Sequence, residues 1–244
     1  MNKVSNINCL GYSIFNGRLE DIEIGNNVLV NTINQYSYCI AEKDELFKEA
    51  LKNSDILLPD GIAIVHASKF LNGTKIKKIA GADIHNFLLQ KLNEENGSCF
   101  YFGASESTLA KIEERLKQEF SNIRFKSYSP PFKSKFSNEE NSEMIHVINE
   151  FNPDVLFVGM TAPKQEKWAY DNKNKLKTGL ICSIGAVFDF YAGTVQRPGK
   201  IWVALGLEWL GRLLKEPRRM WRRYIVYGFI FLNKMVVAKL TRRN

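Results

Sequence analysis

The stretch "VLFVGMTAPKQEKWAYDN", residues 155–172, contains the change of pattern that decides the fold. Its first five residues, 155–159, form a short apolar run of the kind found in buried strands. Pro163 can then occupy the first turn of a helix that continues through "KQEKWAYDN". A buried strand followed by a loop and a helix is the repeating unit of α/β proteins with a parallel sheet.

The same unit recurs on both sides of this stretch. Three further apolar runs are short, β-rich and followed by loops, and amphipathic stretches lie between them: 56–58, 99–103 and 180–184. The "SNEE" of residues 137–140 has the spacing of a capping box and predicts a helix start. The alternation therefore predicts a parallel α/β sheet. Before residue 50 the segments are shorter, and we expect "NNVLVNTIN", residues 26–34, to form a hairpin or edge strands.

The positive charge of the chain is concentrated at its C-terminal end. The 244 residues carry a net charge of +8, and residues 218–244 hold eight basic residues and no acid, which leaves 26 basic against 26 acidic residues elsewhere. Within this tail the apolar run at 224–238 is shorter than the roughly 18–20 residues of a membrane span and is interrupted by Lys234. The sequence therefore predicts a tail that lies on a membrane rather than crossing it.

Several classes of site are disfavoured by what the sequence lacks. The four cysteines are too far apart for a metal or redox motif, and no secretory signal precedes them, which favours reduced thiols in the cytoplasm. The histidines lack metal-ligand spacing. Without a G-x-G-x-x-G motif or a P-loop, neither a dinucleotide enzyme nor an ordinary NTPase is favoured.

Polar residues follow the predicted strands at the places where open α/β sheets bind ligands. Asp60 stands between a proline and a glycine directly after a buried strand, where a carboxylate is costly unless it has a role. It could act on a substrate, or it could cap the following helix. Gln165 enters a first helical turn beside another strand end, and Asp189 follows the last strand. Asp189 is as well explained by a loop-fixing hydrogen bond as by catalysis.

Five segments in a fixed order resemble the WecG/TagA/CpsF glycosyltransferases, which build bacterial surface polymers such as teichoic acids. They are "NTIN" (31–34), "PDG" (59–61), "AGAD" (80–83), "APKQE" (162–166), and "GAVFDFYAG" (185–193) followed by "LEWLGRLLKEPRRMWRRY" (207–224). The resemblance implies a Rossmann-like core of the GT-E type, here residues 1–200. It also implies a helical, membrane-associating appendage, here residues 201–244.

The resemblance further implies an activity. Members of this family transfer N-acetylmannosamine, its uronic acid or glucose from a UDP-sugar to an undecaprenyl-diphosphate-linked sugar, with inversion and without a metal or other cofactor. The implied partners are the donor, the lipid-linked acceptor, the inner face of the cytoplasmic membrane and a second copy of the chain, but no nucleic acid. The absence of a D-x-D motif agrees with metal independence.

Site residues are implied where this sequence matches the family motifs. Asp60 matches the general base, Thr32 and Asn34 match positions near the sugar, and Gln165 matches a donor contact. The "AGAD" segment adds Asp83 as a substrate-binding residue.

The sequence departs from the family pattern just before that segment. Lys78 stands where many members carry an arginine, so a bidentate phosphate contact becomes a point-charge contact.

The tail supplies cations for the leaving diphosphate in the absence of a metal. Pro217 separates a helix carrying Arg212 from one beginning "RRMWRRY". Arg219 and Arg222, which match family arginines, are predicted to act on the diphosphate, and Arg212 is predicted to bind substrate. Helical spacing puts Arg219, Arg222 and Arg223 on one face and Trp221, Tyr224 and Ile225 on a neighbouring apolar stripe. The residues predicted to bind the membrane are Trp221, Arg223, Tyr224 and Ile225.

Two other interpretations remain open from the sequence. The tail could be a solvated basic helix. The whole chain could be a non-catalytic module that binds nucleotide sugars or nucleic acid through its basic tail.

Overall fold

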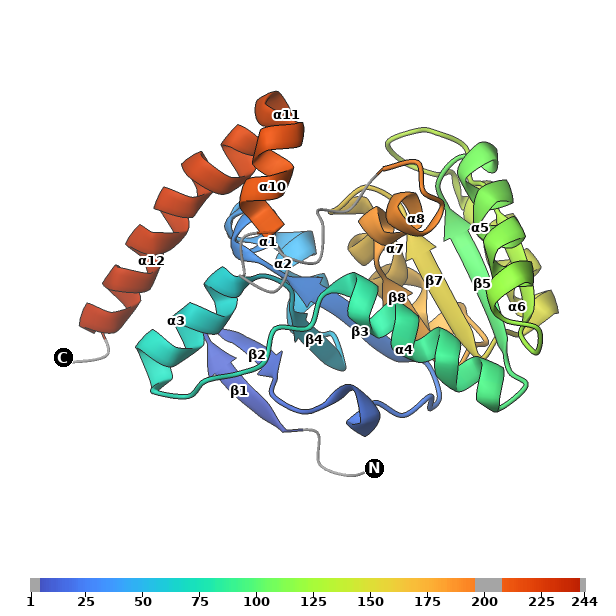
Figure 1. Ribbon diagram of the computed structural model, residues 1–244, viewed down its shortest axis with the longest axis horizontal. Helices are drawn as coiled ribbons and strands as arrows, with labels where there is room; N and C mark the ends of the chain where they lie inside the picture. The colour runs from blue at the N-terminus through green and yellow to red at the C-terminus, as the bar shows by residue number, and fades with distance from the viewer. Residues whose placement is uncertain (1–4, 196–207, 242–244) are drawn as a thin grey trace.

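The computed structural model describes residues 5–195 and 208–241, apart from the side chains of Glu208 and Arg219. A six-stranded, fully parallel sheet with the order β4-β3-β8-β7-β5-β6 forms the centre (Figure 1). Its strands are β3 (Val28–Ile33), β4 (Ile56–Pro59), β5 (Ser98–Gly103), β6 (Arg124–Tyr128), β7 (Val155–Gly159) and β8 (Leu180–Ser183). A small antiparallel hairpin, β1 (Asn6–Cys9) and β2 (Tyr12–Phe15), lies outside it. The predicted parallel α/β fold is confirmed.

Helices cover both faces of the sheet and the edge beside β4. One face packs against α4 (Gly81–Glu94), α5 (Glu106–Glu119) and α8 (Gly185–Tyr191), and the other packs against α6 (Asn138–Phe151) and α7 (Lys164–Asn172). Around β3 and β4, the hairpin packs with α1 (Gln35–Ala41), α2 (Glu45–Lys52) and α3 (Ile62–Asn72), and α2 lies beside α7. Two 3-10 turns complete this part of the chain: η1 (Leu19–Asp21) and η2 (Lys173–Lys175).

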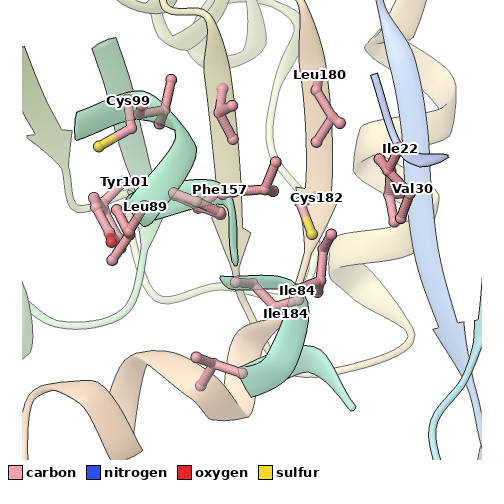
Figure 2. Close-up of a cluster of buried hydrophobic side chains, with 14 of the residues drawn as sticks. Ile22, Val30, Ile84, Leu89, Cys99, Tyr101, Phe157, Leu180, Cys182 and Ile184 are labelled. Atoms are coloured by element: carbon pink, nitrogen blue, oxygen red, sulfur yellow. The ribbon is translucent and has the colours of Figure 1, made fainter. Parts of the chain in front are cut away.

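The core between the sheet and α4 is almost entirely apolar. Figure 2 shows Val30, Tyr101 and Phe157 from three strands facing Ile84 and Leu89 of α4. All four cysteines are free and buried, so they contribute to packing.

The strand predictions were right for the apolar runs and wrong for one segment that mixes polar and apolar residues. The runs at 56–58, 99–103, 155–159 and 180–184 correspond to β4, β5, β7 and β8. The segment "NNVLVNTIN" was predicted as a hairpin or edge strands, yet it contains β3, which lies between β4 and β8. Its polar Asn31 is fully buried and donates to the Ser54 hydroxyl at 2.9 Å and the Ala50 carbonyl at 3.4 Å, so the alternation does not mark a solvated face.

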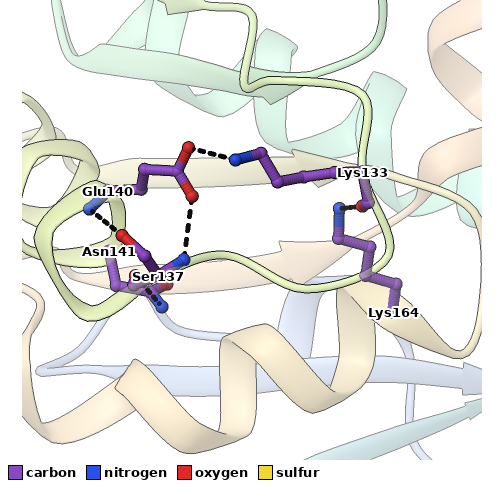
Figure 3. A network of polar contacts seen from close by, with 5 residues as sticks. All are labelled: Lys133, Ser137, Glu140, Asn141 and Lys164. Carbon is purple, nitrogen blue, oxygen red and sulfur yellow. Dashed lines mark hydrogen bonds and ion pairs between the residues drawn. The ribbon is translucent and has the colours of Figure 1, made fainter.

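The predicted capping box at the start of α6 is present. The Glu140 N–H donates to Ser137 Oγ, and the Ser137 N–H donates to the Glu140 carboxylate at 2.8 Å (Figure 3). The other carboxylate oxygen of Glu140 meets Lys133 Nζ at 2.5 Å. Lys164 Nζ then donates to the Lys133 carbonyl at 2.5 Å and lies over the Phe136 ring, so it ties the loop before α6 to the start of α7.

The C-terminal helices form a connected arm. They are α10 (Glu208–Lys215), α11 (Pro217–Trp221), the π-helical turn η3 (Arg222–Val226) and α12 (Tyr227–Thr241), with Pro217 at the predicted break. Figure 1 shows α12 beside α3, at the opposite end of the molecule from α5 and α6. The predicted division at residue 200 falls in the segment 196–207, outside the described residues.

The arm is fixed to the core at several points. Phe231 of α12 is buried, with its ring 5.4 Å from that of Tyr38 in α1. Lys239 Nζ donates to the Phe70 carbonyl at 2.8 Å, near the end of α3. The continuous helix of residues 222–241 is 20 residues long and by length and composition could cross a membrane. The expectation that this segment is too short to span was therefore wrong, because the helix extends beyond the apolar run at both ends. That it lies on a membrane stays a prediction.

Candidate active site

The turn that carries Asp60 is held on both sides by backbone hydrogen bonds. The Asp60 N–H donates to the Ile33 carbonyl of β3 at 2.9 Å, and the Ile79 N–H donates to the Pro59 carbonyl at 3.0 Å. Gly61 follows with φ +132°, and a Cβ there would lie 3.3 Å from the Asn34 Cβ. Only glycine suits this conformation. Gly61, not Asp60, is the N-cap residue of α3, which weakens the capping interpretation of Asp60.

Asp60 lines a pocket of about 440 Å³ between the core and the C-terminal arm. This volume is within the usual range for small-molecule sites. The core side is formed by the start of α1, the β4–α3 turn and Lys78, and the other side by residues of α10, η3 and α12. The lining residues are Asn34, Gln35, Tyr36, Asp60, Gly61, Ile62, Ala63, His66, Lys78, Trp209, Arg212, Arg223, Tyr224, Ile225, Gly228, Phe229, Phe231, Leu232 and Met235.

Asn34 is both a pocket residue and the cap of α1. Its side-chain oxygen accepts from the N–H groups of Tyr36 and Ser37, each at 3.0 Å. Because both bonds use the side-chain oxygen, the amide nitrogen is the group of Asn34 that can donate to a ligand. Thr32 lies two residues earlier in β3, half-buried, and is not among the residues that line the pocket.

Three cationic side chains line the same pocket as Asp60. Lys78 comes from the segment before α4, and Arg212 and Arg223 come from the arm. The Arg212 guanidinium lies 4.8 Å from the centre of the Phe190 ring, and that of Arg223 lies 4.6 Å from the Tyr36 ring. Both distances are typical of cation–π contacts, which hold a guanidinium in place.

The π-helical turn η3 decides which tail residues face the pocket. A π turn has wider spacing than an α-helix, so it changes the direction of the side chains around it. Arg223, Tyr224 and Ile225 line the pocket, whereas Trp221 and Arg222 are exposed outside it.

The turn divides the set that was predicted to bind a membrane. Trp221 is exposed, whereas Arg223, Tyr224 and Ile225 line the pocket. That these residues bind a membrane stays a prediction. Arg219 belongs to α11 by its backbone, and its side chain lies outside the described part of the structure.

Gln165 is buried behind the carboxyl edge of the sheet and is not among the pocket residues. Its Oε1 accepts the Gly185 N–H at 3.0 Å, and its Nε2 donates to Glu166 Oε1 at 2.9 Å. Gln165 thereby joins the start of α7 to the start of α8. Burial raises the pKa of its neighbour Glu166 to about 7. Sequence reasoning missed Glu166, because an acid in a first helical turn ordinarily indicates an exposed dipole contact.

The two other acids singled out in the sequence make local hydrogen bonds. Asp83 is exposed, and its Oδ2 accepts the Ala80 N–H at 2.9 Å at the start of α4. The Asp189 carboxylate accepts from Thr194 Oγ1 at 3.4 Å, and its carbonyl accepts from the same hydroxyl at 3.1 Å and from the Val195 N–H at 3.2 Å. Within residues 5–195 and 208–241, no three His, Cys, Asp or Glu side chains are grouped as metal ligands would be.

Comparison with known proteins shows the family to which the chain belongs. The chain matches the glycosyl transferase WecG/TagA/CpsF family over residues 5–244. It is 30% identical over 185 residues to a Bacillus spizizenii protein, covering 76% of this chain and 70% of that protein. It is 29% identical over 205 residues to a Bacillus subtilis protein, covering 84% and 77%. Both relatives are named N-acetylglucosaminyldiphosphoundecaprenol N-acetyl-beta-D-mannosaminyltransferase. From these matches and the fold, the chain belongs to the WecG/TagA/CpsF family of glycosyltransferases.

Proposed function

We propose that this protein transfers a sugar, N-acetylmannosamine or a close relative, from a UDP-sugar to a sugar linked to undecaprenyl diphosphate. The observation that carries the proposal is the pocket that joins Asp60 to Lys78, Arg212 and Arg223. A carboxylate beside several cations suits a reaction in which a hydroxyl loses a proton while a diphosphate gains charge. The names of the two relatives support the lipid-linked acceptor and the transferred sugar.

Asp60 serves as the general base. Its carboxylate takes the proton of the acceptor hydroxyl as that oxygen forms a bond to the anomeric carbon of the donor. The bond from the anomeric carbon to the UDP oxygen breaks, and UDP leaves with the electron pair. Attack opposite the leaving group inverts the anomeric configuration. The fixed backbone around Asp60 supports this role, because a base must stay within hydrogen-bond reach of its proton.

Positive side chains stabilise the departing diphosphate without a metal ion. Lys78, Arg212 and Arg223 line the pocket, which supports their role as diphosphate ligands. Arg219 and Arg222 keep the catalytic role predicted from the family motif. Thr32, Asn34, Gln165 and Asp83 remain predicted substrate contacts, with Asn34 supported best by its place in the pocket. Gln165 also positions the start of α8 relative to α7 through its bond to the Gly185 N–H.

The protein acts at the inner face of the cytoplasmic membrane. The support is a helix whose outer face exposes Val236, Val237 and Leu240, joined to a tail rich in basic residues. Basic residues near an anionic membrane contribute about 1 kcal/mol each. The apolar side chains add hydrophobic burial in the interface.

A transfer assay without metal tests the proposal. The purified chain is incubated with a panel of UDP-sugars and a short-chain lipid-diphosphate acceptor that bears N-acetylglucosamine, with and without EDTA. We expect transfer from at least UDP-N-acetylmannosamine at a rate that EDTA does not change. Transfer from none of the donors would overturn the proposed function. Activity that is lost with EDTA and restored by Mn²⁺ or Mg²⁺ would overturn metal independence alone.

A further inference from the structure

The pocket at Asp60 continues as an apolar groove between α3 and the arm. On α3 the groove is lined by Ile62, Ala63 and His66. Along the arm the lining runs from Arg223 to Met235, which is about 18 Å of helix at the usual rise per residue. Beyond Tyr224, the arm residues that line it are apolar: Ile225, Gly228, Phe229, Phe231, Leu232 and Met235.

The groove is a fixed feature, because α12 is attached to the core along its length. The Tyr227 ring meets that of Tyr36 edge-on at 5.0 Å, and Phe231 is buried in the middle of the helix. At the far end, Lys239 binds the carbonyls of Phe70 and Leu71. α3 and α12 therefore run side by side from the pocket outward.

Gly228 leaves space in the wall of the groove. A Cβ at this position would meet no atom within 4 Å, although glycine in a helix is less favourable than alanine. On the same stretch of wall, Phe229 is 71% exposed and Leu232 is 50% exposed. The groove thus opens outward next to the exposed Val236 and Leu240 of the same helix.

We propose that this groove holds the first isoprene units of a prenyl diphosphate, whose own diphosphate lies where the groove meets the pocket, beside Arg223 and next to the cations that face the departing UDP. The order of groups along the site carries the inference: a carboxylate at Asp60, then Arg223, then an apolar channel that opens beside an apolar helix face. A sugar, a diphosphate and a hydrocarbon chain joined in that order match it. A nucleotide sugar has no group for the apolar part. The inference rests on the proposed function, since it locates the acceptor of that reaction.

Binding of prenyl diphosphates tests the groove separately from catalysis. Calorimetry compares inorganic pyrophosphate with farnesyl diphosphate, in the absence of membranes, on the full-length chain. We expect farnesyl diphosphate to bind at least about tenfold more tightly, since buried methylene groups add affinity. Equal affinity for the two probes would overturn the proposal.

Variants on α12 test where the prenyl group binds. Gly228→Leu should remove most of the preference for farnesyl diphosphate and leave pyrophosphate affinity within about twofold, because the new side chain fills the groove and not the polar end. Asn233→Leu adds the same side chain at an exposed position outside the lining, and it should behave as the unaltered protein. If both variants, or neither, lost the preference for farnesyl diphosphate, the prenyl group would not bind in this groove.

A second variant covers the case in which Gly228→Leu does not fold. Phe229→Ala removes an exposed wall of the groove at little cost to the core, and it should weaken farnesyl diphosphate binding about threefold or more without affecting pyrophosphate. Unchanged binding of both probes would count against the groove. A chain that binds farnesyl diphosphate in this way but transfers no sugar would refute the proposed function and leave the groove intact.

Discussion

Asp60 has a rigid backbone and an open pocket in front of it. Its N–H and the neighbouring Pro59 carbonyl are both engaged in backbone hydrogen bonds, so the backbone that carries the carboxylate is held in place. Because Gly61 takes the N-cap position of α3, the helix start does not require the Asp60 side chain. These features favour a chemical role over a structural one.

We expect Asp60→Asn to abolish transfer while UDP-sugar binding stays nearly unchanged. The amide keeps the shape of the carboxylate but cannot accept a proton, and general-base catalysis contributes about 10²–10⁴-fold. Single-turnover transfer and calorimetric donor binding measure the two effects. A loss of less than about threefold would make Asp60 a structural residue.

Glu166 couples the pH to the stability of the fold. Burial raises its pKa from the ordinary value of 4.5 to about 7, while the Gln165 amide donates to one of its oxygens. The folded chain therefore holds a proton that the unfolded chain releases between about pH 4.5 and pH 7. The contribution of Glu166 is most favourable below pH 4.5 and is lost as the pH rises through about 7.

Replacement of Glu166 by glutamine should remove this pH dependence. The shift corresponds to an order of about 3 kcal/mol, and Glu166→Gln should raise the free energy of unfolding at pH 8 relative to the unaltered chain by up to that amount. The new amide oxygen can still accept from Gln165. Urea unfolding at pH 5 and pH 8 gives the comparison, and parallel pH profiles for the two proteins would show that Glu166 is not protonated in the fold.

At the scale of single elements, α3 has a glycine at each end, and the two glycines differ in the space available for a side chain. Gly61 has φ +132° and little space for a side chain, whereas Gly73 has φ +72° and no atom within 4 Å of a Cβ. Gly73 is the C-cap of the helix in the left-handed conformation. The first glycine shapes the turn that carries Asp60, and the second only ends the helix.

We expect Gly61→Ala to lower both stability and kcat, and Gly73→Ala to lower stability alone. A strained backbone of the first kind costs about 1–3 kcal/mol, and the left-handed conformation costs an alanine about 1–2 kcal/mol. Movement at residue 61 also displaces Asp60, and catalysis is sensitive to small displacements. Thermal unfolding and kcat on a soluble acceptor measure both effects. A normal kcat in Gly61→Ala would show that the turn tolerates the change.

The π turn η3 gives a prediction about neighbouring arginines. Arg223 lines the pocket and Arg222 is exposed, so Arg223→Ala should lower kcat by about 10- to 100-fold, more than Arg222→Ala does. Arg218→Ala removes an exposed charge from α11 and is the matched control for net charge. A larger loss in Arg222→Ala than in Arg223→Ala would make Arg222 the more important diphosphate ligand and refute the ranking drawn from the pocket lining.

At the scale of the whole molecule, α12 has two faces with separate partners. Its inner face packs on α1 and α3 through Phe231, and its outer face exposes Val236 and Leu240. Deleting residues 218–244 would remove both faces at once and uncover the core beneath. Point substitutions on the outer face are therefore the better test of membrane attachment.

The double variant Val236→Gln and Leu240→Gln should release the protein from anionic vesicles by about tenfold or more in partition coefficient. Turnover of a soluble acceptor should stay the same, because neither residue lines the pocket. Leu46→Gln changes a comparably exposed leucine on α2 and serves as control. Vesicle sedimentation that is equal for all three proteins would place the membrane contact elsewhere.

The sequence by itself determined the parallel α/β sheet, the start of α6, the break at Pro217, the family and the candidate base. These features depend on residues close together in the chain, where apolar periodicity, capping residues and short motifs act directly. The motif around Asp60 could be recognised because its proline, acid and glycine are adjacent in the chain and form one turn.

Only the tertiary structure decided which distant residues meet. It placed β3 inside the sheet, where the buried amide of Asn31 finds partners in Ala50 of α2 and in Ser54 just after that helix. It also joined Arg223 to Tyr36 across the pocket, through a π turn that no residue pattern marks. Periodicity assumes one residue spacing throughout a helix, so a single change of spacing redirects the side chains that follow. Which of them faces the pocket is settled by packing between segments far apart in the chain.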